Sequence, residues 1–102
     1  MLNAATRAVN LVGKRTLEDF EADDTAVLAL ARLLEVLGEA ASHVSQEVRS
    51  ANPKIPWGDM TGTRNRLIHA YFFTDVGVIW RIATEDLPPL VVALRALVPE
   101  ER

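Results

Sequence analysis

The chain of 102 residues contains no cysteine. This excludes disulfides, thiol nucleophiles, and zinc or iron–sulfur centres that depend on cysteine ligands. The sequence also lacks any apolar run approaching about 18 residues, so we expect no membrane-spanning helix. Polar residues interrupt the first twelve positions, so no signal peptide is expected and the predicted location is cytoplasmic.

The sequence also lacks a large excess of either charge. Its 11 basic and 14 acidic residues give a formal net charge of only −3. A generic, sequence-independent nucleic-acid binder is therefore not the default expectation. The acids cluster between Glu18 and Asp24, which is typical of a solvated turn. With 49% hydrophobic and 25% charged residues the balance is globular, and we expect one domain over residues 1–102.

The clearest predicted helix runs from about Thr25 to Arg49, capped by Asp24 or Thr25. Apolar residues recur along it at alternating steps of three and four, namely Val27, Leu30, Leu34, Leu37, Ala41, Val44 and Val48. Arg32, Glu35, Glu39 and His43 fall on the opposite face. This row could hold a metal through its carboxylates, but we favour a solvated helix face.

Four further helical segments are predicted. The first covers Leu2 to Val12 and ends near Gly13, and a short turn capped by Thr16 follows it. After Pro56 we expect a helix over Trp57–His69, with Asp59 in its first turn. Thr74-Asp75 should cap the next helix, which includes Val76, Ile79, Trp80 and Ala83.

The last predicted helix is capped by Asp86, with Pro88 and Pro89 in its first turn and a buried face of Leu90, Leu94 and Leu97. Because no strand-period pattern is present, the sequence predicts an all-α, up-and-down bundle of four or five helices. Trp57 and Trp80 are interpreted as core or interface anchors rather than platforms for stacked bases.

Arg64 falls in the middle of an apolar arc of its predicted helix. Met60, Leu67, Ile68 and Tyr71 all lie within about 60° of it on a helical wheel. Burying an unpaired guanidinium is very costly, so this side chain needs an acid such as Asp59 or Glu39, a wet cleft, or a second chain. Asn65 and His69 lie together, one turn apart, on an adjacent side.

The pair Arg64 and His69 carries chemistry suited to RNA cleavage. Histidine exchanges protons near neutral pH, and arginine presents a planar fork of donors that matches phosphate oxygens. His69 would deprotonate the ribose 2′-hydroxyl or protonate the leaving oxygen, while Arg64 would stabilise charge on the phosphate. Since the 2′-hydroxyl is an internal nucleophile, we expect no metal and no cofactor.

Arg64-Asn65, His69 and Ala70-Tyr71 together resemble the R-x4-H-x-Y motif of HepT-like toxins, helical ribonucleases of the HEPN superfamily. Further similar segments are Leu37–Ala41, Ile55–Trp57, Ile79-Trp80 and Thr84–Pro88. The resemblance covers roughly Thr16 to Leu97. Thr63 departs from it, since the family often has a larger apolar residue there. The first helix already includes Leu2, so we expect either a late beginning of the chain or an alternative start.

The resemblance implies a homodimeric, HEPN-like bundle in which Arg64 and His69 of both chains form one composite site at a two-fold cleft. It implies a metal-independent endoribonuclease toxin whose partner is an MNT-type nucleotidyltransferase antitoxin, able to attach AMP to Tyr71. Asn65 would orient His69 or the phosphate, and Glu39 is a candidate to support Arg64.

Two other functions remain open on the sequence. One is a non-catalytic HEPN-like module that binds a nucleotide or serves as a scaffold for a nucleotidyltransferase. The other is a structural helical dimer in which Arg64 forms a buried bridge to an acid. The sequence does not name the RNA that a ribonuclease of this kind would cut.

Overall fold

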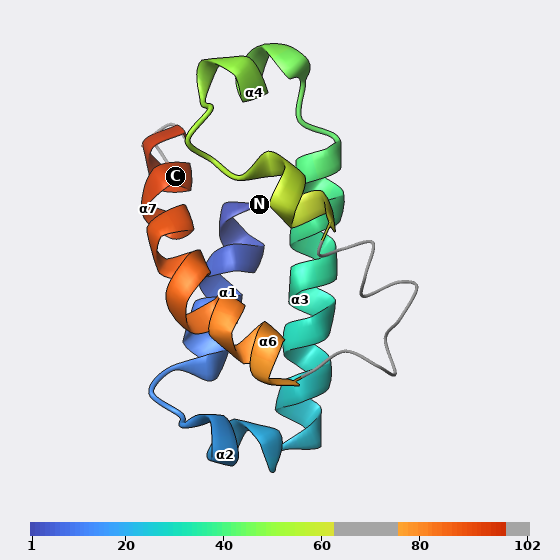
Figure 1. Cartoon of the computed structure of the whole chain (residues 1–102), viewed down its shortest axis with the longest axis vertical. Coiled ribbons are helices and arrows are strands. Elements are labelled where there is room, and N and C mark those ends of the chain that lie inside the picture. Colours follow the sequence, from blue (N-terminus) through green and yellow to red (C-terminus); the bar gives the residue numbers. More distant parts are fainter. Residues whose placement is uncertain (63–75, 98–102) are drawn as a thin grey trace.

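The computed structural model describes residues 1–62 and 76–97, and all regular structure in these two ranges is helical. The elements are α1 (Leu2–Val12), α2 (Leu17–Glu21), α3 (Asp24–Ser42), α4 (Gln46–Ala51), α6 (Val76–Arg81), the π-helix η2 (Ile82–Asp86) and α7 (Leu87–Leu97). Residues 57–62 are helical as well. The predicted all-α class is confirmed (Figure 1).

Helix α1 forms the centre of the packing, against both α3 and α7. Its bounds are those predicted, and Gly13 ends it with a φ of 56°, in the left-handed region that glycine adopts without strain. Its buried face consists of Ala4, Ala5, Ala8 and Val12. Because three of these four side chains are single methyl groups, they hold little volume between the neighbouring helices.

Side-chain caps set the starts of the next two helices. Thr16 Oγ1 accepts a hydrogen bond from the backbone N–H of Asp19 at 3.1 Å, as the sequence predicted. The cap of α3 was predicted one or two residues too late, because Asp23 Oδ1 accepts the N–H of Ala26 at 3.1 Å. Phe20, which the sequence analysis did not single out, is fully buried between these caps.

The single helix predicted from Thr25 to Arg49 is wrong near its C-terminal end, because it is broken over residues 43–45. Helix α3 ends at Ser42, and the chain turns before α4 begins at Gln46. Ser45 is the reason for the new start, since its hydroxyl accepts the N–H of Val48 at 3.3 Å. The apolar period that continued through Val48 was misleading, because Val48 is 39% exposed. Helix α4 stands at one end of the bundle (Figure 1).

The C-terminal part also differs from the prediction. Residues 76–97 are helical without a break, so Asp86 is not a cap but the last residue of η2. Pro88 and Pro89 have no N–H to donate, and their rings press on the preceding carbonyls. A π turn, in which the N–H of Leu87 bonds to the carbonyl of Ile82, accommodates them.

The buried face of this long helix follows the prediction for most of its length. Ile79, Ala83, Leu90 and Leu94 are buried, whereas Leu97 is 39% exposed. Trp80 is half-buried, and its Nε1 donates to the carbonyl of Arg15 at 3.4 Å, which ties α6 to the turn between α1 and α2.

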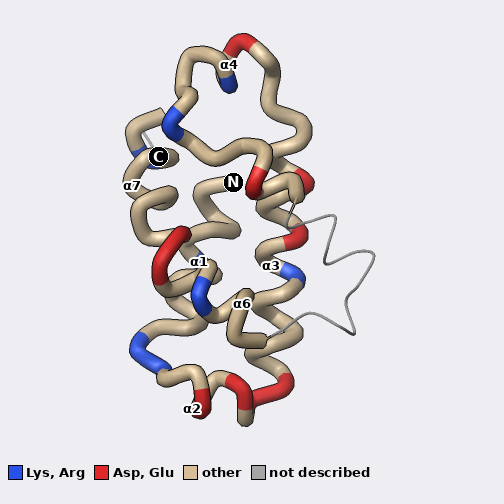
Figure 2. The backbone as a smooth tube through the Cα atoms, in the orientation of Figure 1, with Lys and Arg blue, Asp and Glu red and all other residues tan. Residues whose placement is uncertain are grey.

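The acidic cluster lies at the end of the bundle formed by α2 and the start of α3 (Figure 2). Its residues are exposed except for Asp23, which caps α3 and pairs with Arg15 at 3.2 Å. The described helices include none with the length and apolar character to cross a bilayer.

Replacing Ala8 with leucine tests the alanine face of α1. Ala8 is 1% exposed, so three added carbons have no space between α3 and α7. We expect the free energy of unfolding in urea to fall by about 2 kcal/mol. Arg7→Leu is the matched control, because Arg7 is exposed on the same helix, and it should change stability by less than about 0.5 kcal/mol. Equal effects of the two variants would contradict the packing.

Candidate functional site

The residues singled out as catalytic or modified, Arg64, Asn65, His69 and Tyr71, lie outside the described residues, as do Phe72, Phe73 and the predicted cap Thr74-Asp75. Their roles therefore stay predictions. The structure describes the segment that leads into the motif and the helix that follows it from Val76.

Residues 52–62, here called the approach segment, are anchored by buried apolar side chains. Ile55, Trp57 and Met60 are 5%, 8% and 7% exposed. Trp57 Nε1 donates to the carbonyl of Asn52 at 3.0 Å, so the indole is both packed and hydrogen-bonded. The prediction that Trp57 is a core anchor is confirmed, and the anchors fix the direction in which the chain enters the motif.

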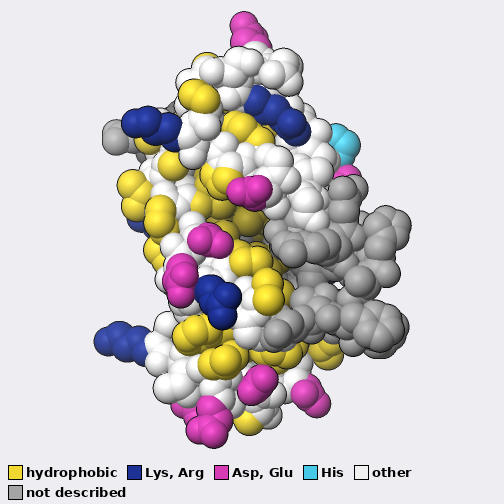
Figure 3. All heavy atoms as spheres, viewed as in Figure 1, with side chains coloured by type: hydrophobic (Ala, Val, Ile, Leu, Met, Phe, Trp, Pro, Cys, Tyr) yellow, Lys and Arg dark blue, Asp and Glu magenta, His cyan; other side chains and the backbone are white. Residues whose placement is uncertain are grey.

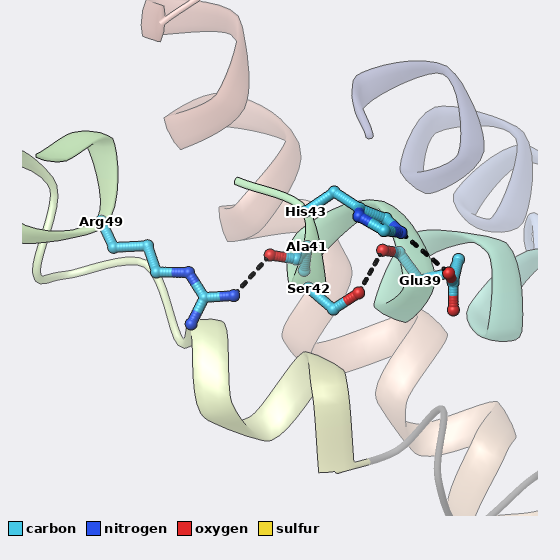
Figure 4. A network of polar contacts seen from close by, with 5 residues as sticks. All are labelled: Glu39, Ala41, Ser42, His43 and Arg49. Carbon is cyan, nitrogen blue, oxygen red and sulfur yellow. Dashed lines mark hydrogen bonds and ion pairs between the residues drawn. The ribbon is translucent and has the colours of Figure 1, made fainter. Parts of the chain in front are cut away.

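The end of α3 is tied to α4 by one arginine (Figure 4). Arg49 Nη2 donates to the carbonyl of Ala41 at 2.8 Å, and the Ser42 hydroxyl donates to the carbonyl of Glu39 at 2.7 Å. Both bonds go to carbonyls in the last turn of α3, where the carbonyl of Ala41 also accepts the backbone N–H of Val44 at 3.2 Å. The guanidinium thereby holds α4 against α3 just before the approach segment begins.

Glu39 lies on the exposed face of α3, where the sequence placed it. Its Oε2 is 2.9 Å from Nε2 of His43, and the two side chains are 50% and 75% exposed. Arg32 and Glu35 form a second ion pair on the same face. The row is thus a solvated, ion-paired face, as favoured from the sequence. Among the described residues, no three His, Asp or Glu side chains come together as a metal would require.

A hollow of about 930 Å³ lies beside the approach segment. One wall is the approach segment itself, from Lys54 to Gly62, and the other is formed by α6, η2 and α7. Figure 3 shows it with hydrophobic side chains in its depth and charged ones around its rim. Sequence reasoning missed this feature, because the two walls are separated by more than a dozen positions and no local pattern joins them.

Removing the Arg49 side chain tests the tie between α3 and α4. We expect Arg49→Ala to lower the free energy of unfolding by about 1–2 kcal/mol, because a charged hydrogen bond to the carbonyl of Ala41 is lost. Arg32→Ala is the control, since its exposed pair with Glu35 is worth less than about 0.5 kcal/mol. Urea unfolding measures both, and an Arg49→Ala variant as stable as Arg32→Ala would refute the tie.

Comparison with known proteins agrees with the fold. The family model described as "Ribonuclease HepT-like" matches residues 1–97. A chain of Thermococcus cleftensis named "Probable ribonuclease HepT" is 42% identical over 73 residues, which are 72% of this chain and 66% of its own length. A candidate RNase of Caldanaerobacter subterraneus subsp. tengcongensis is 33% identical over 85 residues, or 83% of this chain and 76% of its own.

A candidate RNase of Methanocaldococcus jannaschii is 42% identical over 62 residues, or 61% of this chain and 57% of its own length. The chain thus spans between about half and three quarters of these relatives. No solved structure matches the chain significantly. Since the family model covers residues 1–97, and relatives named as ribonucleases are 33–42% identical over the aligned residues, the chain belongs to the HepT-like ribonuclease family.

Proposed function

We propose that this chain is a metal-independent endoribonuclease toxin of a toxin–antitoxin pair. The observation that carries the proposal is the family match over residues 1–97, because that range includes the motif Arg64, His69 and Tyr71. Relatives that are 42% and 33% identical to it are named as ribonucleases. RNA is therefore the proposed substrate.

The proposed reaction is attack by the ribose 2′-hydroxyl on the adjacent phosphorus. His69 removes the proton of the hydroxyl, or donates one to the 5′-oxygen as the bond to it breaks. Arg64 binds the phosphate oxygens, where negative charge builds up in the transition state. The products are a 2′,3′-cyclic phosphate and a free 5′-hydroxyl, and Asn65 keeps His69 or the phosphate in position.

A homodimer supplies what one copy lacks in this mechanism. General-base and general-acid steps need two proton-exchanging groups, and each motif provides one histidine. In a composite site, His69 and the partner subunit's His69 would serve the two steps. Helical spacing predicts Arg64 on the same side of its helix as Met60, an apolar residue four positions earlier. An arginine on that side is best explained by a partner chain and bound phosphate.

Glu39 is proposed to support the arginine. Its position in the last turn of α3 is fixed, and its carboxylate is within hydrogen-bond distance of His43 without being buried. A carboxylate at such a place can orient a guanidinium by a bidentate contact. Because the pair with His43 is exposed, replacing Glu39 with glutamine should leave stability nearly unchanged, so a loss of activity would report on this support.

The first test is cleavage of RNA by the purified, unmodified protein. We expect cleavage to persist in EDTA and to leave cyclic phosphate ends, which end-labelling of the fragments would detect. Arg64→Ala and His69→Ala should each lower the cleavage rate at least about a hundredfold, in line with the loss of a charge-stabilising or acid–base group. Glu39→Gln should retain part of the activity.

The control is Arg66→Ala, because Arg66 is predicted on the solvated side of the same helix. This variant should cleave RNA at close to the wild-type rate. Circular dichroism and urea unfolding would show that all variants fold. Nucleotide binding that depends on Arg64 without any turnover would contradict the ribonuclease and favour the non-catalytic module. Activity that disappears in EDTA would contradict the metal-independent mechanism.

Regulation through Tyr71 is the second part of the proposal. A nucleotidyltransferase antitoxin of the MNT type would transfer AMP from ATP to the phenolic oxygen of Tyr71 and release pyrophosphate. Each transferred AMP adds a negatively charged phosphodiester next to the motif. Since RNA is itself a polyanion, this charge would repel the substrate and block the site.

Intact mass after co-expression with the nucleotidyltransferase tests this regulation. The protein should gain mass in whole AMP units, and Tyr71→Phe should show none while it still cleaves RNA. The phenylalanine variant is a close control, because it removes only the acceptor oxygen. AMP on another residue in the Tyr71→Phe protein, or an adduct that leaves cleavage unchanged, would contradict the proposal.

A further inference from the structure

Residues 44–51, here called the arm, lie outside the packed core of the bundle. They form the turn after α3 and helix α4, which stands at one end of the molecule (Figure 1). None of their side chains is buried, and although Val44 packs against the core, Val48 is 39% exposed. The chain is in the core before the arm at Ala41, which is fully buried, and after it at Ile55, which is 5% exposed. The arm therefore contributes little buried apolar surface to the stability of the fold.

Hydrogen bonds hold the arm in its place. The Ser45 hydroxyl accepts the N–H of Val48 at 3.3 Å, and this cap stabilises α4 itself. Arg49 Nη2 donates to the carbonyl of Ala41 at 2.8 Å, which closes α4 onto the end of α3 (Figure 4). The closed position of α4 thus depends on this guanidinium.

The same arginine leaves the closed arm only weakly stable. Among the residues that the structure describes, no carboxylate pairs with Arg49 and no acceptor meets its buried Nε. Removing a guanidinium from water without filling its donor positions costs free energy, which offsets part of the gain from the bond to Ala41. Segments with little buried apolar surface also open at a lower free energy than the core does. Both features indicate an arm that can open by itself.

The arm is coupled to the approach segment through Asn52, which directly follows it. The Asn52 carbonyl accepts the Nε1–H of Trp57 at 3.0 Å, and Asn52 Nδ2 donates to the carbonyl of Val48 at 2.9 Å. A displacement of α4 therefore also moves the acceptor of the Trp57 indole. Trp57 begins the helical residues 57–62, which lead towards the motif.

We propose that the arm opens and closes as a unit while the bundle stays folded, and that Arg49 keeps it closed. In the closed state Asn52 holds the indole of Trp57, and the approach segment enters the motif in a fixed direction. In the open state this hydrogen bond is lost. Arg49 is thereby a positioning residue, because it acts through Asn52 and Trp57 and not on RNA. The positioning role rests on the proposed function, whereas the opening of the arm does not.

Amide hydrogen exchange in the native protein tests the opening. For the N–H of Arg49, which bonds to the carbonyl of Ser45 at 3.1 Å, we expect a protection factor of only about ten. Amides in the middle of α1 should have factors of at least about a thousand, because they exchange when the core unfolds. Dilute urea should change the exchange of α4 little, since the opening exposes little surface.

Two control variants separate the arm from the rest of the chain. Ala8→Leu weakens the core, so it should speed the exchange of α1 and leave that of α4 unchanged. Arg32→Ala removes an exposed arginine of α3, and it should change the exchange of α4 by less than about twofold.

A graded series at position 49 measures what keeps the arm closed. Arg49→Lys retains a cationic donor, Arg49→Ala has none, and Arg49→Glu places a negative charge near the carbonyls at the C-terminus of α3. The exchange of α4 should become faster in this order, by about fivefold for the alanine variant. In the glutamate variant it should approach the rate of an unprotected chain.

Tryptophan fluorescence tests the coupling to the approach segment. The chain has two tryptophans, so Trp80→Phe leaves Trp57 as the reporter. On that background, Arg49→Glu should raise the acrylamide quenching of Trp57 at least about twofold, because the open arm no longer covers the indole. Urea unfolding verifies that each variant folds.

RNA cleavage tests the positioning role. The kcat should follow the closed fraction of the arm, falling about twofold in Arg49→Ala and about tenfold in Arg49→Glu. KM should stay within about threefold of wild type, because Arg49 does not bind the substrate. Arg49→Lys should retain more activity than the alanine variant.

Each result decides a separate part. Exchange in α4 that is as slow as in α1, or that Ala8→Leu speeds equally in both, would overturn the opening of the arm. Quenching of Trp57 that is the same along the series would overturn the coupling, and a kcat independent of the closed fraction would overturn the positioning role. A wild-type protein that cleaves no RNA would overturn the proposed ribonuclease, while exchange and fluorescence would still decide whether the arm opens.

Discussion

The close contact of the alanine face of α1 with α3 and α7 is the constraint on which the rest of the bundle depends. Ala5 and Ala8 are almost completely buried, and their methyl groups allow three helices to approach with little side-chain volume between them. Such packing gains stability from contact area and density rather than from large side chains. It also fixes α7, and with it η2, relative to α3.

The packing of α1, α3 and α7 also determines where the approach segment lies. Arg49 and Ser42 close the end of α3, and Ile55, Trp57 and Met60 then press the returning chain onto the core. Hydrogen bonds at the end of α3 and buried apolar side chains of the approach segment thus stabilise neighbouring parts of the chain. The segment is therefore anchored as far as Met60, four residues before Arg64, which suits a site that needs precise geometry.

Periodicity and capping rules predicted much of this fold, and the failures have physical causes. The bounds of α1 followed from Gly13, and the cap by Thr16 followed from its spacing to Asp19. The end of α3 was missed because apolar spacing continues through Val48, although Ser45 caps a new helix there by accepting the N–H of Val48. The π turn was missed because two prolines are compatible with either a break or a wider turn.

For the site, the motif was recognised in the sequence through its resemblance to a family. The structure then showed the approach segment and the hollow beside it. Glu39 was placed correctly on the exposed face of α3, and Trp57 correctly in the core. The hollow and its rim could not be predicted, since Lys54 and Glu85 approach one another only in the folded chain.

The position of α1 also determines when the protein can fold during synthesis. Helix α1 leaves the ribosome before the other described helices, but one side of its alanine face is covered by α7, the last of them to be made. Until Leu87 and the residues after it have emerged, that side stays open to water or to α7 of a different nascent chain. The core therefore closes only after α7 has emerged, and Trp80, which precedes α7, bonds to the turn after α1.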